Sequence, residues 1–134
     1  MRAVIQRVLS ASVSVNGILK SEIQEGFLIL LGVDKYDDVE DVKWLSNKIV
    51  KLRIFSDSQG RMNQSITDIK GDIMVVSQFT LHARTKKGNR PSYTQSAQGD
   101  KAVLFYNKFL NFLELDFGKK IQKGVFGSNM QVDM

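Results

Sequence analysis

The sequence predicts an α+β fold in which two main helices pack on barrel-like layers of mostly antiparallel or mixed β-sheet. Segments typical of strands follow one another in runs, and only two stretches carry apolar residues at helical spacing. This order differs from the strict strand–helix alternation of parallel α/β proteins. The chain has 134 residues, of which 43% are apolar and 25% charged, which suits one domain spanning residues 1–134.

The amino-terminal third is expected to form a β-meander. Residues 1–9 and 11–15 are rich in β-branched side chains, and Asn16-Gly17 then provides a turn because both residues tolerate positive φ. A further strand is expected at residues 18–23. The run 27–33 is apolar on both faces, which predicts a buried strand.

Two amphipathic helices follow from the spacing of apolar residues. The first, around residues 42–52, has its apolar side chains three and four positions apart, and Asp37 or Asp38 is expected to cap it. The second is expected to be capped by Asp100 and to end at Gly118. Its apolar face consists of Ala102, Phe105, Tyr106, Phe109, Leu110 and Leu113.

The remaining strands are expected between the two helices and after the second one along the chain. Residues 57–60 form a turn cluster, and residues 73–81 then predict a long inner strand. Two closing strands are expected at residues 125–126 and 130–134.

Composition excludes several classes of function. The chain has no cysteine, so disulfides, thiolate metal sites and a cysteine nucleophile are ruled out. The apolar run 27–33 is much shorter than the roughly 20 residues that cross a bilayer. Neither a phosphate-cradling glycine loop nor a dinucleotide fingerprint occurs. The net charge of +5 makes a polyanionic partner plausible, although it also fits an ordinary basic surface.

The most informative segment is residues 77–81, where an apolar strand becomes polar at Ser77, Gln78 and Thr80. A polar strand end can direct hydroxyl, amide and backbone N–H groups at one small ligand, and backbone N–H groups suit a developing oxyanion. The alternative is that these side chains only satisfy local hydrogen bonds.

Four cations follow within seven positions, at Arg84, Lys86, Lys87 and Arg90, around Gly88-Asn89. A flexible basic loop of this kind suits a phosphate backbone. A solvated surface segment is the alternative, because most charge runs have no other role.

His82, the only histidine, lies two residues after Thr80, and the two side chains would share a face if the strand continued. This raises the hypothesis of a Thr–His nucleophile pair. The alternative is an exposed or packed histidine without a catalytic role.

Two extended motifs carry a resemblance to a known family. Residues 77–81 (SQFTL) and 87–93 (KGNRPSY) are similar to those of the D-aminoacyl-tRNA deacylases, and they occur in the family's order. Supporting matches lie at residues 1–8 (MRAVIQRV) and 124–127 (GVFG), followed by Met130 and Val132.

The resemblance implies a cytoplasmic homodimer that proofreads translation. It would hydrolyse the ester between a D-amino acid, or glycine on the wrong tRNA, and the terminal adenosine, assisted by the tRNA's own 2′-hydroxyl. No metal or other cofactor is expected. The expected partners are the aminoacylated 3′ end of tRNA and a second copy of the chain, with no membrane or DNA partner.

The resemblance also assigns roles to residues. Gln78 would position the substrate, the Phe79 and Thr80 backbone amides would face the ester carbonyl, and Ser77 would support them. Arg7 would support the pocket. The cations expected near phosphate are Lys86, Lys87 and Arg90.

One departure from the family pattern lies at the carboxyl end. The family continues into a Gly-Pro-containing loop that enters the partner subunit's site and excludes L-amino acids, whereas this sequence ends at Asp133-Met134. Two other functions stay open: a tRNA-binding module without turnover, similar to the editing domain of some threonyl-tRNA synthetases, and a Thr-nucleophile esterase acting on small substrates.

Overall fold

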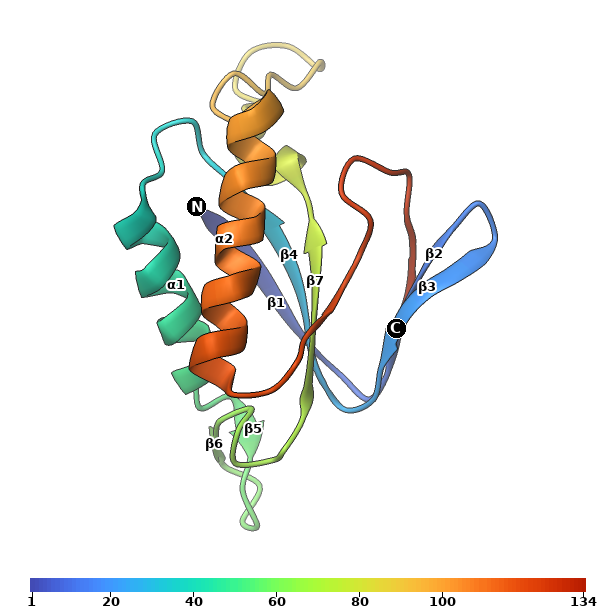
Figure 1. Ribbon diagram of the computed structural model, residues 1–134, viewed down its shortest axis with the longest axis vertical. Coiled ribbons are helices and arrows are strands. Elements are labelled where there is room, and N and C mark those ends of the chain that lie inside the picture. Colours follow the sequence, from blue (N-terminus) through green and yellow to red (C-terminus); the bar gives the residue numbers. More distant parts are fainter.

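The computed structural model describes residues 1–134 and confirms the predicted α+β class (Figure 1). The strands form a four-stranded sheet in the order β1-β4-β7-β8, a three-stranded sheet β3-β2-β9 and a small sheet β5-β6. The elements are β1 (Arg2–Val8), β2 (Ala11–Val15), β3 (Ile18–Ile23), β4 (Gly26–Gly32), α1 (Val39–Lys51), β5 (Phe55–Ser56), β6 (Met62–Gln64), β7 (Asp72–Ser77), the 3-10 helix η1 (Phe79–His82), α2 (Gly99–Phe117), β8 (Gln122–Lys123) and β9 (Gln131–Asp133).

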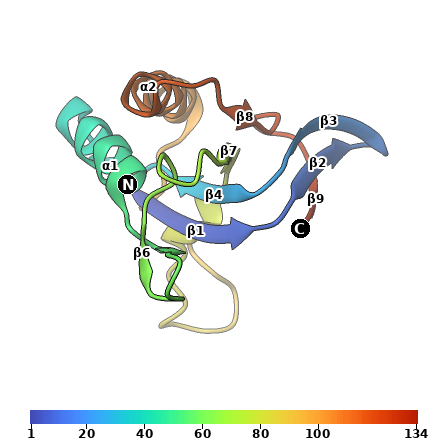
Figure 2. The ribbon, with the colours of Figure 1, turned by 90° about the horizontal axis from the view of Figure 1, so that it is seen from below.

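The helices and the three-stranded sheet pack on opposite faces of the central strands. Figure 2 shows α1 and α2 on one side of β1 and β4, with β2, β3 and β9 at the right, where β1 continues into β2. Side chains of β4 alternate between two cores: Phe27, Ile29 and Leu31 face the helices, and Leu28 faces the smaller sheet. The prediction that residues 27–33 are buried on both faces is therefore confirmed.

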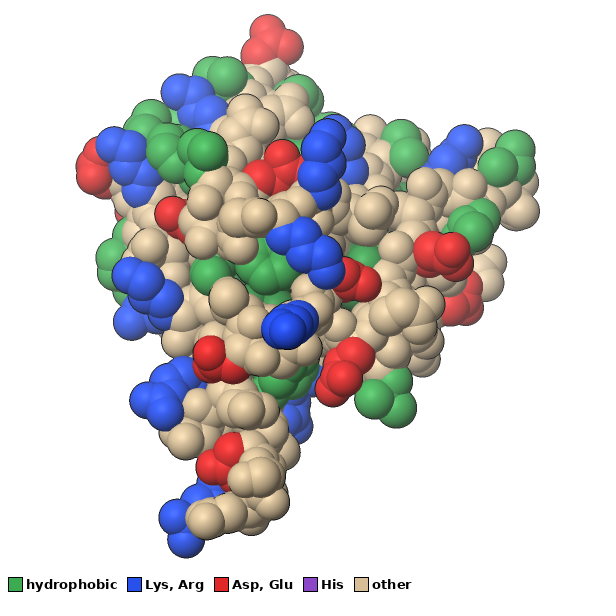
Figure 3. All heavy atoms as spheres, turned by 60° about the horizontal axis from the view of Figure 1, so that its bottom comes forward, with side chains coloured by type: hydrophobic (Ala, Val, Ile, Leu, Met, Phe, Trp, Pro, Cys, Tyr) green, Lys and Arg blue, Asp and Glu red, His purple; other side chains and the backbone are tan.

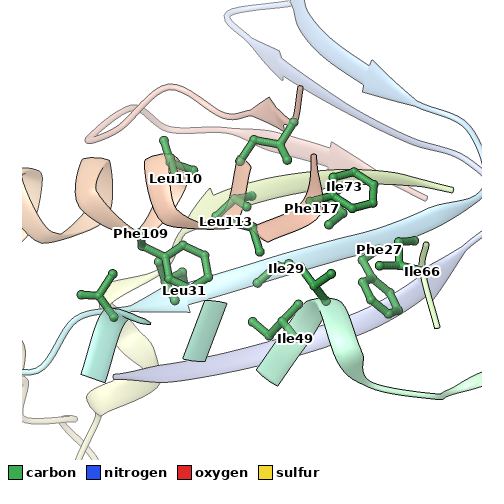
Figure 4. Close-up of a cluster of buried hydrophobic side chains, with 14 of the residues drawn as sticks. Phe27, Ile29, Leu31, Ile49, Ile66, Ile73, Phe109, Leu110, Leu113 and Phe117 are labelled. Atoms are coloured by element: carbon green, nitrogen blue, oxygen red, sulfur yellow. The ribbon is translucent and has the colours of Figure 1, made fainter. Parts of the chain in front are cut away.

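The main core lies between α1, α2 and the four-stranded sheet (Figure 4). Phe109 and Leu113 of α2 and Ile49 of α1 are fully buried there. They pack with Phe27, whose ring stacks on Phe55 at 4.9 Å between centroids. Neither helix has the length and apolar character needed to cross a bilayer.

Strand register determines which residues meet at each end of the strands in the central sheet. β1 runs antiparallel to β4, with Arg2 opposite Gly32. β7 runs parallel to β4, with Ser77 opposite Leu31. The start of β1 and the carboxyl ends of β4 and β7 therefore lie at the same end of the sheet. The polar segment that begins at Ser77 leaves the sheet there.

The helix ends follow the predicted signals with one exception. Asp38 caps α1 in a capping box with Asp41, whereas the neighbouring Asp37 is buried and pairs with the α-amino group of Met1. Gly118 ends α2 in the left-handed region, with φ 72°. The prediction that Asp100 caps α2 is wrong, because the helix begins at Gly99 after the N-cap residue Gln98, and Asp100 lies in its first turn.

The predicted strand 73–81 is too long. β7 ends at Ser77, and the chain turns into η1, because β4 itself ends at Gly32 and offers no further ladder partner beyond the hydrogen bond from Gln78 N–H to the Leu31 carbonyl (2.7 Å). The predicted strand 125–126 is also wrong. Gln122 and Lys123 pair with β7, the Gly124 N–H donates one more hydrogen bond to the Val75 carbonyl (2.9 Å), and the chain then leaves the sheet.

Gly26 is expected to be essential for the pairing of β4 with β7. A Cβ atom at this position would lie 1.9 Å from the Asp72 carbonyl oxygen, so Gly26→Ala must force the two backbones apart. We expect the free energy of unfolding in urea to fall by about 3 kcal/mol, the upper end for overpacking. Gly60→Ala is the control, because that site is open and only its φ of 75° is unfavourable, at about 1 kcal/mol. Equal losses in the two variants would contradict this account.

Candidate functional site

A cavity of about 320 Å³ lies at the carboxyl end of β7. Its walls come from the end of β7, the start of η1, the first turns of α2 and the segment between β8 and β9, which Figure 1 shows beside β7. Ten of its sixteen lining residues are hydrophobic. An apolar cavity with a few polar groups at one end is the usual form of a small-ligand site.

The polar end of the cavity consists of Ser77, Gln78 and Phe79. Thr80 follows directly and is half-buried, and its hydroxyl accepts a hydrogen bond from the Gln78 side-chain amide. Phe79 and Thr80 are the first two residues of η1, so their backbone N–H groups have no acceptor within that helix. The structure thus brings together all four predicted catalytic residues in one turn, with two adjacent backbone donors.

The rest of the lining is mostly apolar and includes residues whose role the sequence did not reveal. Tyr106 of α2 lies at the cavity and in the main core, and its hydroxyl donates a hydrogen bond to the Val75 carbonyl (3.1 Å). Burial raises the pKa of Tyr106 to about 12, so the phenol stays neutral at physiological pH. Its ring lies 5.2 Å from that of Phe126. Phe126 belongs to the segment 124–127 that resembles the deacylase family. That resemblance was the one feature of the sequence that could have indicated this part of the lining.

His82 lies behind the site and does not line the cavity. It is 3% exposed, and its ring packs so closely on Gly32 that a Cβ there would lie 3.0 Å from the ring. Its Nδ1 atom is 3.4 Å from the Asp34 carboxylate. Because η1 replaces the expected strand, Thr80 and His82 do not share a strand face, and Thr80 bonds to Gln78 instead. The packed-histidine alternative therefore fits the structure.

Asp34 connects His82 to the cavity wall. Its side chain accepts the Tyr36 backbone N–H (2.9 Å), which is the main cause that lowers the pKa of this carboxyl, with a smaller contribution from the charge of His82. The Asp34 backbone forms an isolated bridge with Ser96, which lines the cavity.

The four predicted cations lie on an exposed loop beside the site. Two backbone hydrogen bonds between Arg84 and Ser92 (2.8 and 2.9 Å) close it, and Gly88 near its tip has φ 67°. All four cations are exposed and form no ion pair. By contrast, the face seen from below mixes Lys and Arg with Asp and Glu (Figure 3). We call residues 84–92 the basic loop.

Arg7 lies away from the other predicted site residues. It is opposite Phe27, whereas Ser77 is level with Leu31, a separation of four strand positions or about 13 Å. Its guanidinium donates to the Ile54 carbonyl (2.7 Å) and borders a second cavity of about 310 Å³. Within one chain, the structure does not bring Arg7 to the polar end of β7, and its predicted role stays a prediction.

No group of three or more His, Asp or Glu side chains could hold a metal ion. The cavity is lined at the end of β7 by Ser77, Gln78 and Phe79, and the basic loop follows η1 along the chain. This arrangement is typical of a binding domain for a ligand that has both a small polar group and a phosphate. Neutral hydrogen-bond donors would hold the polar group, and cations would hold the phosphate.

The comparison with known families gives this class a specific identity. The sequence pattern of the family described as D-Tyr-tRNA(Tyr) deacylase matches residues 4–134, and the chain belongs to this family. A D-aminoacyl-tRNA deacylase of Flavobacterium johnsoniae is 54% identical over the whole chain, which covers 89% of that relative. One of Phocaeicola vulgatus is 52% identical with the same coverage.

Solved structures support the fold. A c-Myc DNA Unwinding Element Binding Protein superposes with a TM-score of 0.93 at 39% identity, with 98% of this chain and 89% of the other covered. A probable eukaryotic D-amino acid tRNA deacylase superposes with a TM-score of 0.81 at 16% identity, with 98% and 91% covered, and shows likeness of fold alone.

Proposed function

We propose that this protein hydrolyses the ester bond between a D-amino acid, or misplaced glycine, and the terminal adenosine of tRNA. The products are free amino acid and tRNA, and the reaction serves proofreading of translation in the cytoplasm. The observation that carries the proposal is the turn at the end of an apolar cavity, which is lined there by Ser77, Gln78 and Phe79 and continues into Thr80. Phe79 and Thr80 are the first two residues of η1, so their backbone N–H groups are available as donors. Family membership supplies the substrate class.

The proposed chemistry divides between the protein and its substrate. Water attacks the ester carbonyl carbon, and the Phe79 and Thr80 N–H groups stabilise the oxyanion that forms. The bond to the ribose 3′ oxygen then breaks, and that oxygen takes up the proton that the attacking water gives up, with the adjacent 2′-hydroxyl assisting this transfer. Gln78 and Ser77 hold the geometry, and no metal or other cofactor is required by this scheme.

The geometry favours this route over a threonine nucleophile. A hydroxyl nucleophile needs a neighbouring base to take its proton. The hydrogen-bond partner of the Thr80 hydroxyl is the Gln78 amide nitrogen, which donates to it, and an amide nitrogen is not a base. The Thr-nucleophile esterase and the tRNA-binding module without turnover stay as alternatives for the experiments below.

Thr80→Ala separates the two catalytic routes. This variant keeps the backbone N–H, so we expect the single-turnover rate to fall only about tenfold to a hundredfold through looser geometry. Loss of the essential serine nucleophile costs the protease subtilisin a factor on the order of a million in rate. Thr80→Pro removes the N–H donor and is expected to be slower than Thr80→Ala.

The matching change in the substrate is a D-aminoacyl-tRNA ending in 2′-deoxyadenosine. We expect its rate with the unaltered protein to collapse, because the assisting hydroxyl is missing. Normal turnover of this substrate, together with an inactive Thr80→Ala or a trapped acyl-Thr80 species, would rule out the RNA-assisted route. Binding of tRNA without turnover of any substrate would favour the non-catalytic module.

The basic loop is proposed to control tRNA affinity more than chemistry. Replacing Lys86, Lys87 and Arg90 together by Ala should raise the Kd for tRNA and reduce the salt slope by up to about 2 to 3, since each phosphate contact contributes about 0.7 to 0.9. Ala at the exposed Lys51, Lys120 and Lys123 is the matched control.

Fluorescence anisotropy at several salt concentrations measures both quantities. Duplex DNA serves as the competitor, because a structurally similar protein is named for DNA binding. An unchanged salt slope would place the RNA contact elsewhere, and tighter binding of duplex DNA than of tRNA would contradict the proposed substrate.

We also propose that the protein acts as a homodimer. β9 pairs only with β2 and leaves its other edge free, and free strand edges favour association with another chain. Met130 and Val132 pack inward against the smaller core, so the available feature is the backbone edge. Sedimentation at micromolar concentration is expected to give a dimer, and a monomer throughout the concentration range would refute this.

A further inference from the structure

Phe79 has an exposed aromatic ring at the mouth of the cavity. Its side chain is 56% exposed, although Phe79 also lines the cavity. The ring is fixed in an edge-to-face pair with Tyr93, with 5.1 Å between centroids and 74° between planes. Exposing a large apolar ring to water is unfavourable unless another molecule covers it. A ligand that binds at the mouth of the cavity would explain why this ring is held there.

The position of this pair connects the two parts of the proposed site. The Phe79 backbone belongs to the turn with the free N–H donors. Tyr93 directly follows Ser92, which closes the basic loop through its hydrogen bonds to Arg84. The aromatic pair therefore stands between the cavity and the loop that carries four exposed cations.

Aromatic rings beside cations are characteristic of sites for single-stranded nucleic acid. The cations attract the phosphates, and each base can stack its flat face on a ring. An apolar protein partner would not explain the neighbouring cations, because protein interfaces are depleted of lysine at their centres. Charge and surface type together favour a nucleobase as the occupant.

We propose that Phe79, held in place by Tyr93, stacks on the base that precedes the terminal adenosine of the substrate. This inference rests on the proposed function. If the ester carbonyl lies at the Phe79 and Thr80 N–H groups, the terminal adenosine occupies the cavity. The next nucleotide then leaves through the mouth, with its base at the Phe79 ring and its phosphates toward the basic loop. The ring thus recognises a single-stranded 3′ end.

The test compares Phe79→Leu, which keeps the backbone N–H and an apolar side chain, with Phe79→Trp, which restores a flat ring. Each is assayed with a D-aminoacyl-tRNA and with the same tRNA lacking only the penultimate base. The expected result for Phe79→Leu is an increase in KM that is about fivefold to a hundredfold larger on the intact tRNA than on the abasic one, the contribution of one stack. Phe79→Trp should recover most of this difference.

Phe126→Leu is the matched control, because Phe126 belongs to the other cavity wall and pairs with Tyr106. Its loss is expected to be equal on the two tRNAs. Equal losses on the two tRNAs with Phe79→Leu would overturn the stacking inference, since the ring would then affect only the geometry around the ester.

Two further measurements separate this inference from its competitors. Anisotropy with uncharged tRNA and its abasic form tests stacking even without turnover, so an inactive unaltered protein would refute the proposed function and leave the stacking result intact. Sedimentation of Phe79→Leu tests whether a second copy covers the ring. A shift from dimer to monomer, without any dependence on the penultimate base, would assign Phe79 to a subunit interface and overturn the inference.

Discussion

The two hydrophobic cores and the cavity all depend on the parallel pairing of β4 with β7. Both strands are almost fully buried, and their alternate side chains enter the core under the helices and the core under the smaller sheet. Burial on both faces fixes the register of the pairing strongly. A slip by one residue would move each side chain to the opposite face and so into the other core. That register places Ser77 beside Leu31 and so decides where η1 begins.

The proposed chemistry depends more on main-chain geometry than on reactive side chains. Its donors are the first N–H groups of a short helix, and that helix is anchored from several directions. Arg2 donates to the Leu81 carbonyl (2.8 Å), Gln78 N–H bonds to Leu31, and His82 fills the space left by Gly32. Donors fixed in this way need little reorganisation when charge develops on a substrate. The cations lie separately on the basic loop, where phosphate can be attracted without disturbing the donors.

Local signals predicted many elements correctly, and the two errors in the strands have a common cause. The Asn16-Gly17 hairpin, the Asp38 cap and the end of α2 at Gly118 all depend on backbone preferences of the residues themselves. The overlong strand 73–81 and the misplaced strand 125–126 depend on neighbours. A strand continues only while another strand pairs with it, and no periodicity within residues 73–81 reports that β4 ends at Gly32.

The sequence by itself determined the fold class, the family motifs and the polar turn Ser77–Thr80, because these reside in residue types and their order along the chain. Only the tertiary structure decided what surrounds that turn. It brought Tyr106 and Phe126 to the cavity from segments distant in sequence, buried His82 at the end of η1 against Gly32, and left Arg7 at the far end of β1. Such relations follow from strand register and from packing between elements, and these long-range pairings leave no local pattern in the sequence.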